Sequence, residues 1–109
     1  MGKKMLDKMS KKCLTNFEKN GKFKLDLRYF VHQEGQSKVR WSGGAPEQEI
    51  LFSRMWEELF GHSRHPGAPI TEKAKDIAAS LQAILEEIYF HVLNHLYEAT
   101  KTKNLCLAG

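Results

Sequence analysis

Residues 71–100, TEKAKDIAASLQAILEEIYFHVLNHLYEAT, hold the longest regular pattern in the sequence. Thr71 suits the N-cap of a helix, and Glu72 suits the positive end of its dipole. We predict a helix over 71–100, about 45 Å long at a rise of 1.5 Å per residue. A helix of this length in a small chain is expected to pack against further protein. The apolar residues that recur at spacings of three and four, the period of one helix face, are Ile77, Leu81, Ile84, Leu85, Ile88, Val92 and Leu96.

Residues 46–60 show a similar pattern on a shorter scale. Pro46 is favourable in a first helical turn, and Gly61 stands where a C-terminal cap belongs. These features predict a second helix over 46–60. Its two neighbouring apolar stripes are Leu51, Met55 and Leu59, and Phe52, Trp56 and Phe60.

A third helix is predicted near 3–19. Its apolar residues recur every four positions, at Met5, Met9, Cys13 and Phe17. Asn20 and Gly21 tolerate left-handed backbone angles and are expected to end this helix.

Strand patterns flank these helices. The run KFKLDLRYF, residues 22–30, alternates apolar and polar side chains with the period of a half-buried strand. Together with KVRW at 38–41, it predicts a β-hairpin near 23–41. The apolar run NLCLAG predicts a short C-terminal strand over 104–109. The expected fold is therefore α+β, mainly helical, with residues 1–109 forming one domain.

Composition favours a soluble globular protein. The chain has 109 residues, of which 41% are hydrophobic and 28% are charged. No apolar run approaches the roughly 20 residues of a membrane span, and no secretory signal is present at the N-terminus. Cys13 and Cys106 lie far apart with no CxxC spacing, which favours a reducing, cytoplasmic location. A disulfide between them is the less favoured alternative.

Charge is unevenly distributed along the chain. Residues 1–24 contain eight lysines against Asp7 and Glu18, a balance of +6, and residues 25–109 carry −2. A solvated helix face is the favoured interpretation of the basic head. The alternative is a small basic interaction module that binds nucleic acid or an acidic partner. The head lacks the interleaved aromatic residues that single-strand binders usually add.

The residues offer no self-contained active site. His62 and His65 could supply at most half of a metal site, so two exposed loop histidines are the favoured interpretation and a metal-binding structural domain is the alternative. His91 and His95 share a helix face but lack the glutamate of an HExxH motif. There is no P-loop, no GxGxxG motif and no nucleophile motif.

Two stretches carry a resemblance to a known family. KDIAASLQAILEE at 75–87 and KNLCLAG at 103–109 together resemble the carbamoyltransferases of the NodU/CmcH type, in which a similar helix leads into a strand and a Gly-Gly turn. A more distant version of the pattern occurs in the tRNA threonylcarbamoyl transferases. Both families belong to the actin/sugar-kinase/Hsp70-like ATPase superfamily. Weaker similarity extends to the segments 21–35, 51–61 and 68–82.

This resemblance implies an ATP-dependent O-carbamoyltransferase. Such enzymes transfer a carbamoyl group from carbamoyl phosphate to a hydroxyl-bearing small molecule through carbamoyl-adenylate, and they use a divalent metal, iron or magnesium. Ala108 and Gly109 fall in the nucleotide-binding turn, where glycine lets backbone amides approach a phosphate. The resemblance assigns no catalytic residue here. The family's metal-binding histidine motif has no counterpart in residues 1–60, and we do not assign metal ligation to His62 or His65.

The resemblance also suggests how the chain relates to a larger protein. The family pattern continues beyond Gly109 with a second glycine, so we expect an internal segment of a larger catalytic domain. The remainder of that enzyme is the expected partner. The isolated chain is expected to be inactive, to bind no cofactor, to fray over 104–109, and to be capable of self-association through apolar faces.

Overall fold

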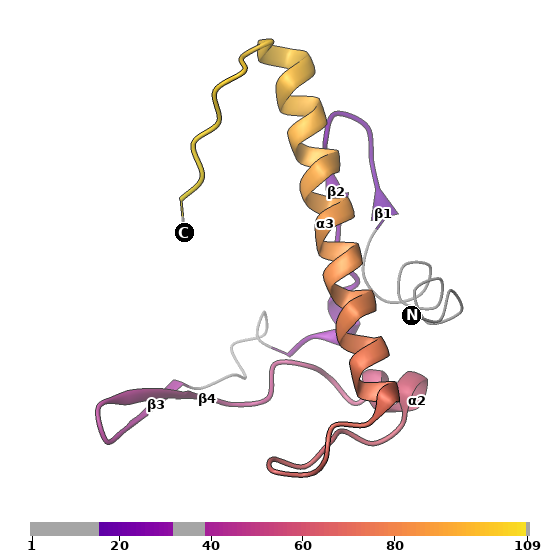
Figure 1. The fold of residues 1–109 in the computed structure, drawn as a ribbon, viewed down its shortest axis with the longest axis vertical. Helices are drawn as coiled ribbons and strands as arrows, with labels where there is room; N and C mark the ends of the chain where they lie inside the picture. Colours follow the sequence, from indigo (N-terminus) through magenta and orange to yellow (C-terminus); the bar gives the residue numbers. More distant parts are fainter. Residues whose placement is uncertain (1–15, 32–38, 109) are drawn as a thin grey trace. The chain divides into compact units, whose positions relative to one another are not determined.

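The computed structural model describes residues 16–31 and 39–108, and the predicted α+β class is confirmed (Figure 1). One long helix and one short helix accompany two small antiparallel sheets of two strands each. The described residues form two compact units: one holds 16–25 and 71–108, and the other holds Asp26–Ile70. That residues 1–109 form one domain of a larger enzyme stays a prediction.

The predicted long helix is present as α3, Glu72–Thr100, with 29 residues. Thr71 caps its N-terminus, where the hydroxyl accepts a hydrogen bond from the Ala74 amide at 3.2 Å. Lys101 ends the helix in the left-handed conformation with φ 53°, and its amide donates to the Tyr97 carbonyl. Within the described ranges, no helix is both long and apolar enough to cross a membrane.

A hairpin precedes α3 in the same unit. Strands β1, Asn16–Phe17, and β2, Phe23–Lys24, pair antiparallel with Phe17 opposite Phe23. The chain reverses at Asn20 and Gly21, whose φ angles are 61° and 69°. Two successive residues with positive φ make a type I′ turn, which matches the twist of antiparallel strands.

This hairpin corrects the helix predicted near 3–19. Residues 3–15 lie outside the described ranges, but Asn16 and Phe17 are a strand and Glu18 is not helical. The prediction was wrong there because Asn-Gly was interpreted as a helix C-cap. The same left-handed preference serves a hairpin turn, and the apolar Phe17 and Phe23 on either side favour that use.

The second unit is built around Tyr29, Trp56 and Phe60. Leu27–Tyr29 form a 3-10 turn, η2, and Met55–Phe60 form the helix α2. The Tyr29 and Trp56 rings meet edge to face with centroids 6.0 Å apart, and the Trp56 and Phe60 centroids are 5.5 Å apart. Tyr29 and Phe60 are buried, so these aromatic contacts form the small core of this unit.

Backbone pairing holds the two halves of this core together. Phe30 and Phe52 form an isolated antiparallel bridge. The Val31 amide donates to the Leu51 carbonyl at 3.0 Å, and the Ser53 amide donates to the Tyr29 carbonyl at 2.9 Å. The Trp56 indole N–H donates to the same Tyr29 carbonyl at 2.8 Å.

Two elements predicted from the sequence differ from those in the structure. Strand β3, Val39–Ser42, pairs with β4, Ala45–Gln48, instead of with residues near 23, so the predicted hairpin over 23–41 was wrong in its pairing. Gly43 and Gly44 form its turn with φ of 58° and 85°. The helix predicted over 46–60 is confined to Met55–Phe60, because Ala45–Gln48 are used as a strand.

The predicted C-terminal strand is not formed in the part of it that the structure describes. Residues 104–108 follow Lys101 as an exposed segment without strand pairing. Leu105 and Leu107 are 52% and 72% exposed. A strand needs a neighbour to receive its backbone hydrogen bonds. That 104–109 fray stays a prediction, and Gly109 lies outside the described residues.

Candidate functional site

The predicted nucleotide turn falls at the edge of the described chain. Ala108 is exposed and belongs to no helix or strand. Gly109 lies outside the described ranges. The assignment of Ala108 and Gly109 to nucleotide binding therefore stays a prediction.

The loop histidines do not gather into a metal centre. His62 is almost fully exposed, and its Nδ1 lies 3.9 Å from a Glu57 carboxylate oxygen. His65 is exposed as well. Across residues 16–31 and 39–108, no three histidine, cysteine or acidic side chains come together in a way that could hold a metal ion. Catalytic metal sites usually take three protein ligands, so a metal of the whole enzyme would need ligands outside these ranges.

Glu57 has a structural use in the same loop. A carboxylate oxygen accepts a hydrogen bond from the Ser63 amide at 3.0 Å. This bond lowers the pKa of Glu57, because it stabilises the charged form. Glu57 therefore helps to hold the chain where it leaves α2 after Gly61.

His91 fastens the β1–β2 hairpin to α3. Its Nε2 lies 3.0 Å from the Glu18 carbonyl and 2.8 Å from the Lys22 carbonyl, so an N–H at Nε2 donates to both. The imidazole also lies against the Phe17 ring with centroids 4.8 Å apart. A ring nitrogen engaged in this way is not available as a metal ligand.

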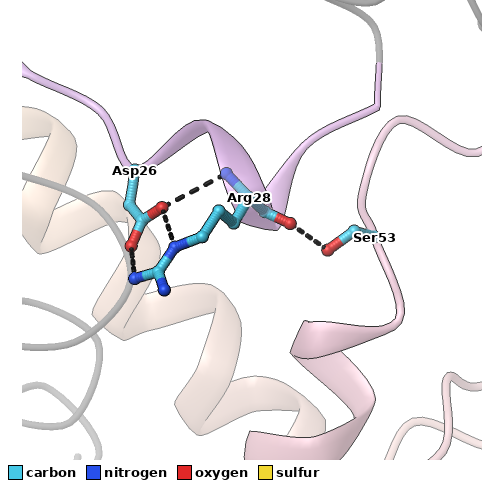
Figure 2. Close-up of polar contacts among 3 residues, drawn as sticks. All are labelled: Asp26, Arg28 and Ser53. Atoms are coloured by element: carbon cyan, nitrogen blue, oxygen red, sulfur yellow. Dashed lines mark hydrogen bonds and ion pairs between the residues drawn. The ribbon is translucent and has the colours of Figure 1, made fainter.

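The second densely bonded group is a polar cluster of Asp26, Arg28 and Ser53 (Figure 2). Asp26 caps η2 by accepting from the Arg28 amide at 3.2 Å. It also accepts from the Arg28 guanidinium, from Nε at 2.9 Å and from Nη2 at 2.6 Å. The Ser53 hydroxyl donates to the Arg28 carbonyl at 2.6 Å. The polar cluster thus joins η2 to the segment that enters α2.

Charge in the polar cluster is internally compensated. The side-chain hydrogen bond from Arg28 lowers the pKa of Asp26, and the same bond raises the pKa of Arg28. The Ser53 hydroxyl donates its hydrogen bond to the Arg28 carbonyl, and its oxygen accepts a hydrogen bond from the Met55 amide at 3.3 Å. The arrangement suits positioning of the backbone and offers neither a poised acid–base pair nor an activated nucleophile.

The sequence analysis predicted neither the attachment of the β1–β2 hairpin to His91 nor the polar cluster. The signal for the hairpin was the Asn20-Gly21 dipeptide between two phenylalanines. The signal for the η2 cap was Asp26 ahead of a short turn, because aspartate accepts hydrogen bonds from following amides. The pairing of Arg28 with Asp26, two residues away, has no periodic signature.

Most lysines of the basic head lie outside the residues that the structure describes. Its lysines at 3, 4, 8, 11 and 12 lie outside the described ranges. Of the others, Lys24 forms an ion pair with Glu18 at 3.1 Å on the β1–β2 hairpin. Binding of nucleic acid or an acidic partner stays a prediction.

Comparison with known proteins gives the decisive match. The sequence profile of the carbamoyltransferase N-terminus matches residues 6–109. The chain belongs to this carbamoyltransferase family. The match spans all the residues that the structure describes, including α3 and the exposed segment after it.

Individual relatives agree with this assignment. An uncharacterized protein of Synechocystis is 31% identical over 97 residues, which cover 88% of this chain and 14% of that protein. Nodulation protein NolNO of Sinorhizobium fredii is 54% identical over 46 residues, covering 42% of this chain and 7% of the relative. Nodulation protein NolO of Bradyrhizobium diazoefficiens is 50% identical over 46 residues, covering 42% and 8%.

The chain therefore spans no more than about a seventh of the length of these curated relatives. No solved structure matches it significantly.

Proposed function

We propose that the chain is a segment of an ATP-dependent O-carbamoyltransferase of the NodU/CmcH type. The whole enzyme transfers a carbamoyl group from carbamoyl phosphate to a hydroxyl acceptor through carbamoyl-adenylate. The observation that carries the proposal is the match of the carbamoyltransferase N-terminus over residues 6–109. The wider kinship with Hsp70/actin-like ATPases is part of the same proposal.

Within that enzyme, the chain contributes to the nucleotide-binding half. The helix α3 ends at Thr100, and the exposed segment after Lys101 leads to Ala108 and Gly109. Backbone amides with little side-chain bulk around them are suited to approach a phosphate. The small side chain of Ala108 and its exposure fit this role. ATP supplies the activation of the carbamoyl group, and these residues would bind and orient its phosphates.

The catalytic metal, iron or magnesium, is assigned to other parts of the enzyme. The described residues hold no three converging donors, and His91 is engaged with backbone carbonyls. The chain alone should not turn over ATP, because residues 16–31 and 39–108 hold no cluster of metal ligands and the chain spans only about a seventh of the length of its relatives. The partners of this function are the remainder of the enzyme, carbamoyl phosphate and the hydroxyl acceptor, in the cytoplasm.

The test uses a carbamoyltransferase polypeptide of the relatives' length that contains this segment. Carbamoyl-phosphate-dependent consumption of ATP is measured for the parent and for Ala108→Glu, which places a side chain and a negative charge where phosphate should approach. We expect KM for ATP to rise at least tenfold. Thr102→Glu is the matched control, because Thr102 lies in the same exposed segment away from the turn. Equal KM values for the two variants would refute the assignment of Ala108.

A second measurement uses the 109-residue chain itself. Mg-ATP is titrated while backbone amide chemical shifts are followed. Shifts confined to Cys106–Gly109 would support a partly preformed nucleotide turn. ATP turnover by the isolated chain that depends on carbamoyl phosphate would contradict the proposal that the segment is incomplete.

A further inference from the structure

The turn of the β1–β2 hairpin holds an asparagine that is followed by glycine. Asn20 is exposed, and Gly21 follows it with φ of 69°. The chain has four asparagines, and the other three precede phenylalanine, histidine and leucine, at positions 16, 94 and 104. An asparagine side chain cyclises onto the backbone nitrogen of the next residue most readily when that residue is glycine, because glycine has no Cβ to crowd the approach. Of the four, Asn20 is therefore the asparagine with the least steric protection.

The reaction is deamidation through a cyclic imide. The Gly21 backbone nitrogen attacks the side-chain carbonyl carbon of Asn20, so a C–N bond forms, and the side-chain nitrogen leaves as ammonia with the proton that Gly21 loses. Water, the only co-reactant, then opens the ring at one of its two carbonyls. Opening at the side-chain carbonyl gives aspartate. Opening at the main-chain carbonyl gives isoaspartate, in which the backbone runs through the side chain.

The attached hairpin resists this cyclisation. In a type I′ turn, ψ of the first central residue is about +30°, and ring closure needs the peptide unit between Asn20 and Gly21 to rotate away from this angle. There is little room for rotation on the side of α3, because a Cβ added to Gly21 would lie 2.7 Å from the Cβ of His95. Hydrogen bonds from His91 hold both ends of the turn. Deamidation should therefore proceed from the fraction of molecules whose hairpin is detached from α3.

The two products differ in what they do to the attachment. The Glu18 and Lys22 carbonyl oxygens converge on Nε2 of His91 at 3.0 and 2.8 Å, so the length of the turn between them fixes their spacing. Isoaspartate at position 20 adds one main-chain carbon to this turn, and the two carbonyls then no longer match one imidazole nitrogen. Aspartate leaves the length unchanged and tolerates positive φ as asparagine does.

We propose that Asn20 is a site of spontaneous deamidation, and that isoaspartate formed there releases the β1–β2 hairpin from α3. Attachment to α3 protects the unmodified turn, and loss of the attachment exposes the turn to the reaction. The modified chain keeps a detached hairpin, because reversal requires the main chain to be shortened again.

The first test follows ageing of the full 109-residue chain in neutral buffer. Peptides released by a glutamate-specific protease are analysed by mass spectrometry, and an isoaspartyl methyltransferase with a labelled methyl donor reports isoaspartate. We expect Asn20 to convert before the other three asparagines. Asn20→Gly is the control, because glycine accepts positive φ and has no amide to cyclise, so isoaspartate should be absent from its turn.

The second test couples the reaction to the attachment. His91→Ala should raise the detached fraction, and each ~1.4 kcal/mol of lost attachment corresponds to about a tenfold increase. We expect conversion of Asn20 to be about tenfold faster, with the rate at Asn104 unchanged, because Asn104 lies in the exposed segment after α3. Phe90→Ala is the matched control and should change neither rate, because Phe90 is 61% exposed on the same helix and has no hydrogen-bonding side chain.

The third test separates the two products. Chains with isoaspartate at position 20 are purified from the aged sample, and their amide hydrogen exchange is compared with that of Asn20→Asp. The Glu18 amide, which donates to the Lys22 carbonyl, is the reporter. We expect it to exchange at least tenfold faster in the isoaspartate chain and to stay near the parent rate in Asn20→Asp.

Any of three results would overturn the proposal. Conversion of Asn104 ahead of Asn20 would show that the turn is not the reactive site. An unchanged rate at Asn20 in His91→Ala would show that the attachment does not control the reaction. Exchange at the parent rate in the isoaspartate chain would show that the hairpin stays attached. None of these results bears on ATP consumption by the longer enzyme, so the proposed function is tested separately.

Discussion

The hairpins β1–β2 and β3–β4 both reverse through two residues with positive φ, yet their surroundings differ. At the first turn, a Cβ added to Gly21 would lie 2.7 Å from the Cβ of His95 on α3. At the second turn, a Cβ added to Gly43 or Gly44 would meet no atom within 4 Å. The first hairpin is packed against a helix, whereas the second stands exposed, with Trp41 73% exposed.

This difference separates two requirements that glycine can satisfy. A type I′ turn needs backbone angles that most residues adopt only at a cost, and this requirement is common to both hairpins. Close approach to a neighbouring element is a second requirement, and in these two hairpins only Gly21 meets it. A two-stranded hairpin alone is marginal in water, so β1–β2 should owe its stability to α3.

The largest expected effect is that of Gly21→Ala compared with Gly43→Ala. Both variants place alanine at positive φ, which costs about 1–2 kcal/mol. Gly21→Ala adds a collision with His95, and forced displacement of packed groups costs a further ~1–3 kcal/mol. Urea denaturation and hydrogen exchange of the Glu18 amide, which donates to the Lys22 carbonyl at 2.8 Å, measure the loss. Equal losses in the two variants would mean that the close approach to α3 does not persist in solution.

The next largest loss of stability is expected at His91, whose side chain holds the β1–β2 hairpin against α3. His91→Ala removes the donor to two carbonyls and the contact with Phe17, and should cost about 2 kcal/mol. His91→Phe keeps a ring against Phe17 and loses the donor alone, so about 1 kcal/mol is expected.

Exchange rates of the β1 and β2 amides measure both losses. Leu81→Ala serves as the reference variant. Leu81 is a half-exposed residue of α3, and its side chain forms no hydrogen bond to the hairpin. If His91→Phe were as damaging as His91→Ala, ring packing would contribute nothing to the attachment.

The sequence predicts elements that depend on local features better than elements that depend on pairing between separate segments. The helix α3 was predictable almost to the residue, because its period, its Thr71 cap and its length are all local features. Residues 46–60 carry a similar period, yet Ala45–Gln48 pair with Val39–Ser42 instead. A Gly-Gly turn that brings two short segments together decides that pairing, and helical periodicity does not report it.

The candidate site was predictable only through resemblance. Nothing about Ala108 or Gly109 in isolation indicates a nucleotide, so their assignment rests on the resemblance alone and stays a prediction. The attachment of His91 to the carbonyls of Glu18 and Lys22 joins residues about 70 positions apart. Contacts at that separation leave no trace in local periodicity.

A smaller effect is expected in the segment that connects the two hairpins. Asp26 caps η2 there, and Asp26→Asn keeps a capping oxygen while removing the charge paired with Arg28. Because solvent screens this pair, we expect a loss of only about 0.5–1 kcal/mol at neutral pH. Urea denaturation of the parent and the variant measures it.

The pH dependence follows from the lowered pKa of Asp26. A carboxyl with a lowered folded pKa contributes stability that is fully present above its unfolded pKa of about 3.9 and is lost as pH falls through the folded value. The difference between parent and Asp26→Asn should therefore shrink below about pH 4. A difference that persists unchanged to lower pH would indicate that the carboxylate charge is not involved.

The smallest effect is expected at the exposed hairpin. Trp41 lies opposite Pro46 in the β3–β4 ladder, and a cross-strand pair contributes about 0.2–1 kcal/mol. With most of its ring in water, Trp41→Ala should cost less than about 0.5 kcal/mol in urea denaturation. In a Trp56→Phe background, the emission of the remaining Trp41 should be that of an indole in water. A blue-shifted emission, or a loss above about 2 kcal/mol, would show that β3–β4 is packed in solution, and the contrast between the two hairpins would then rest on their turns alone.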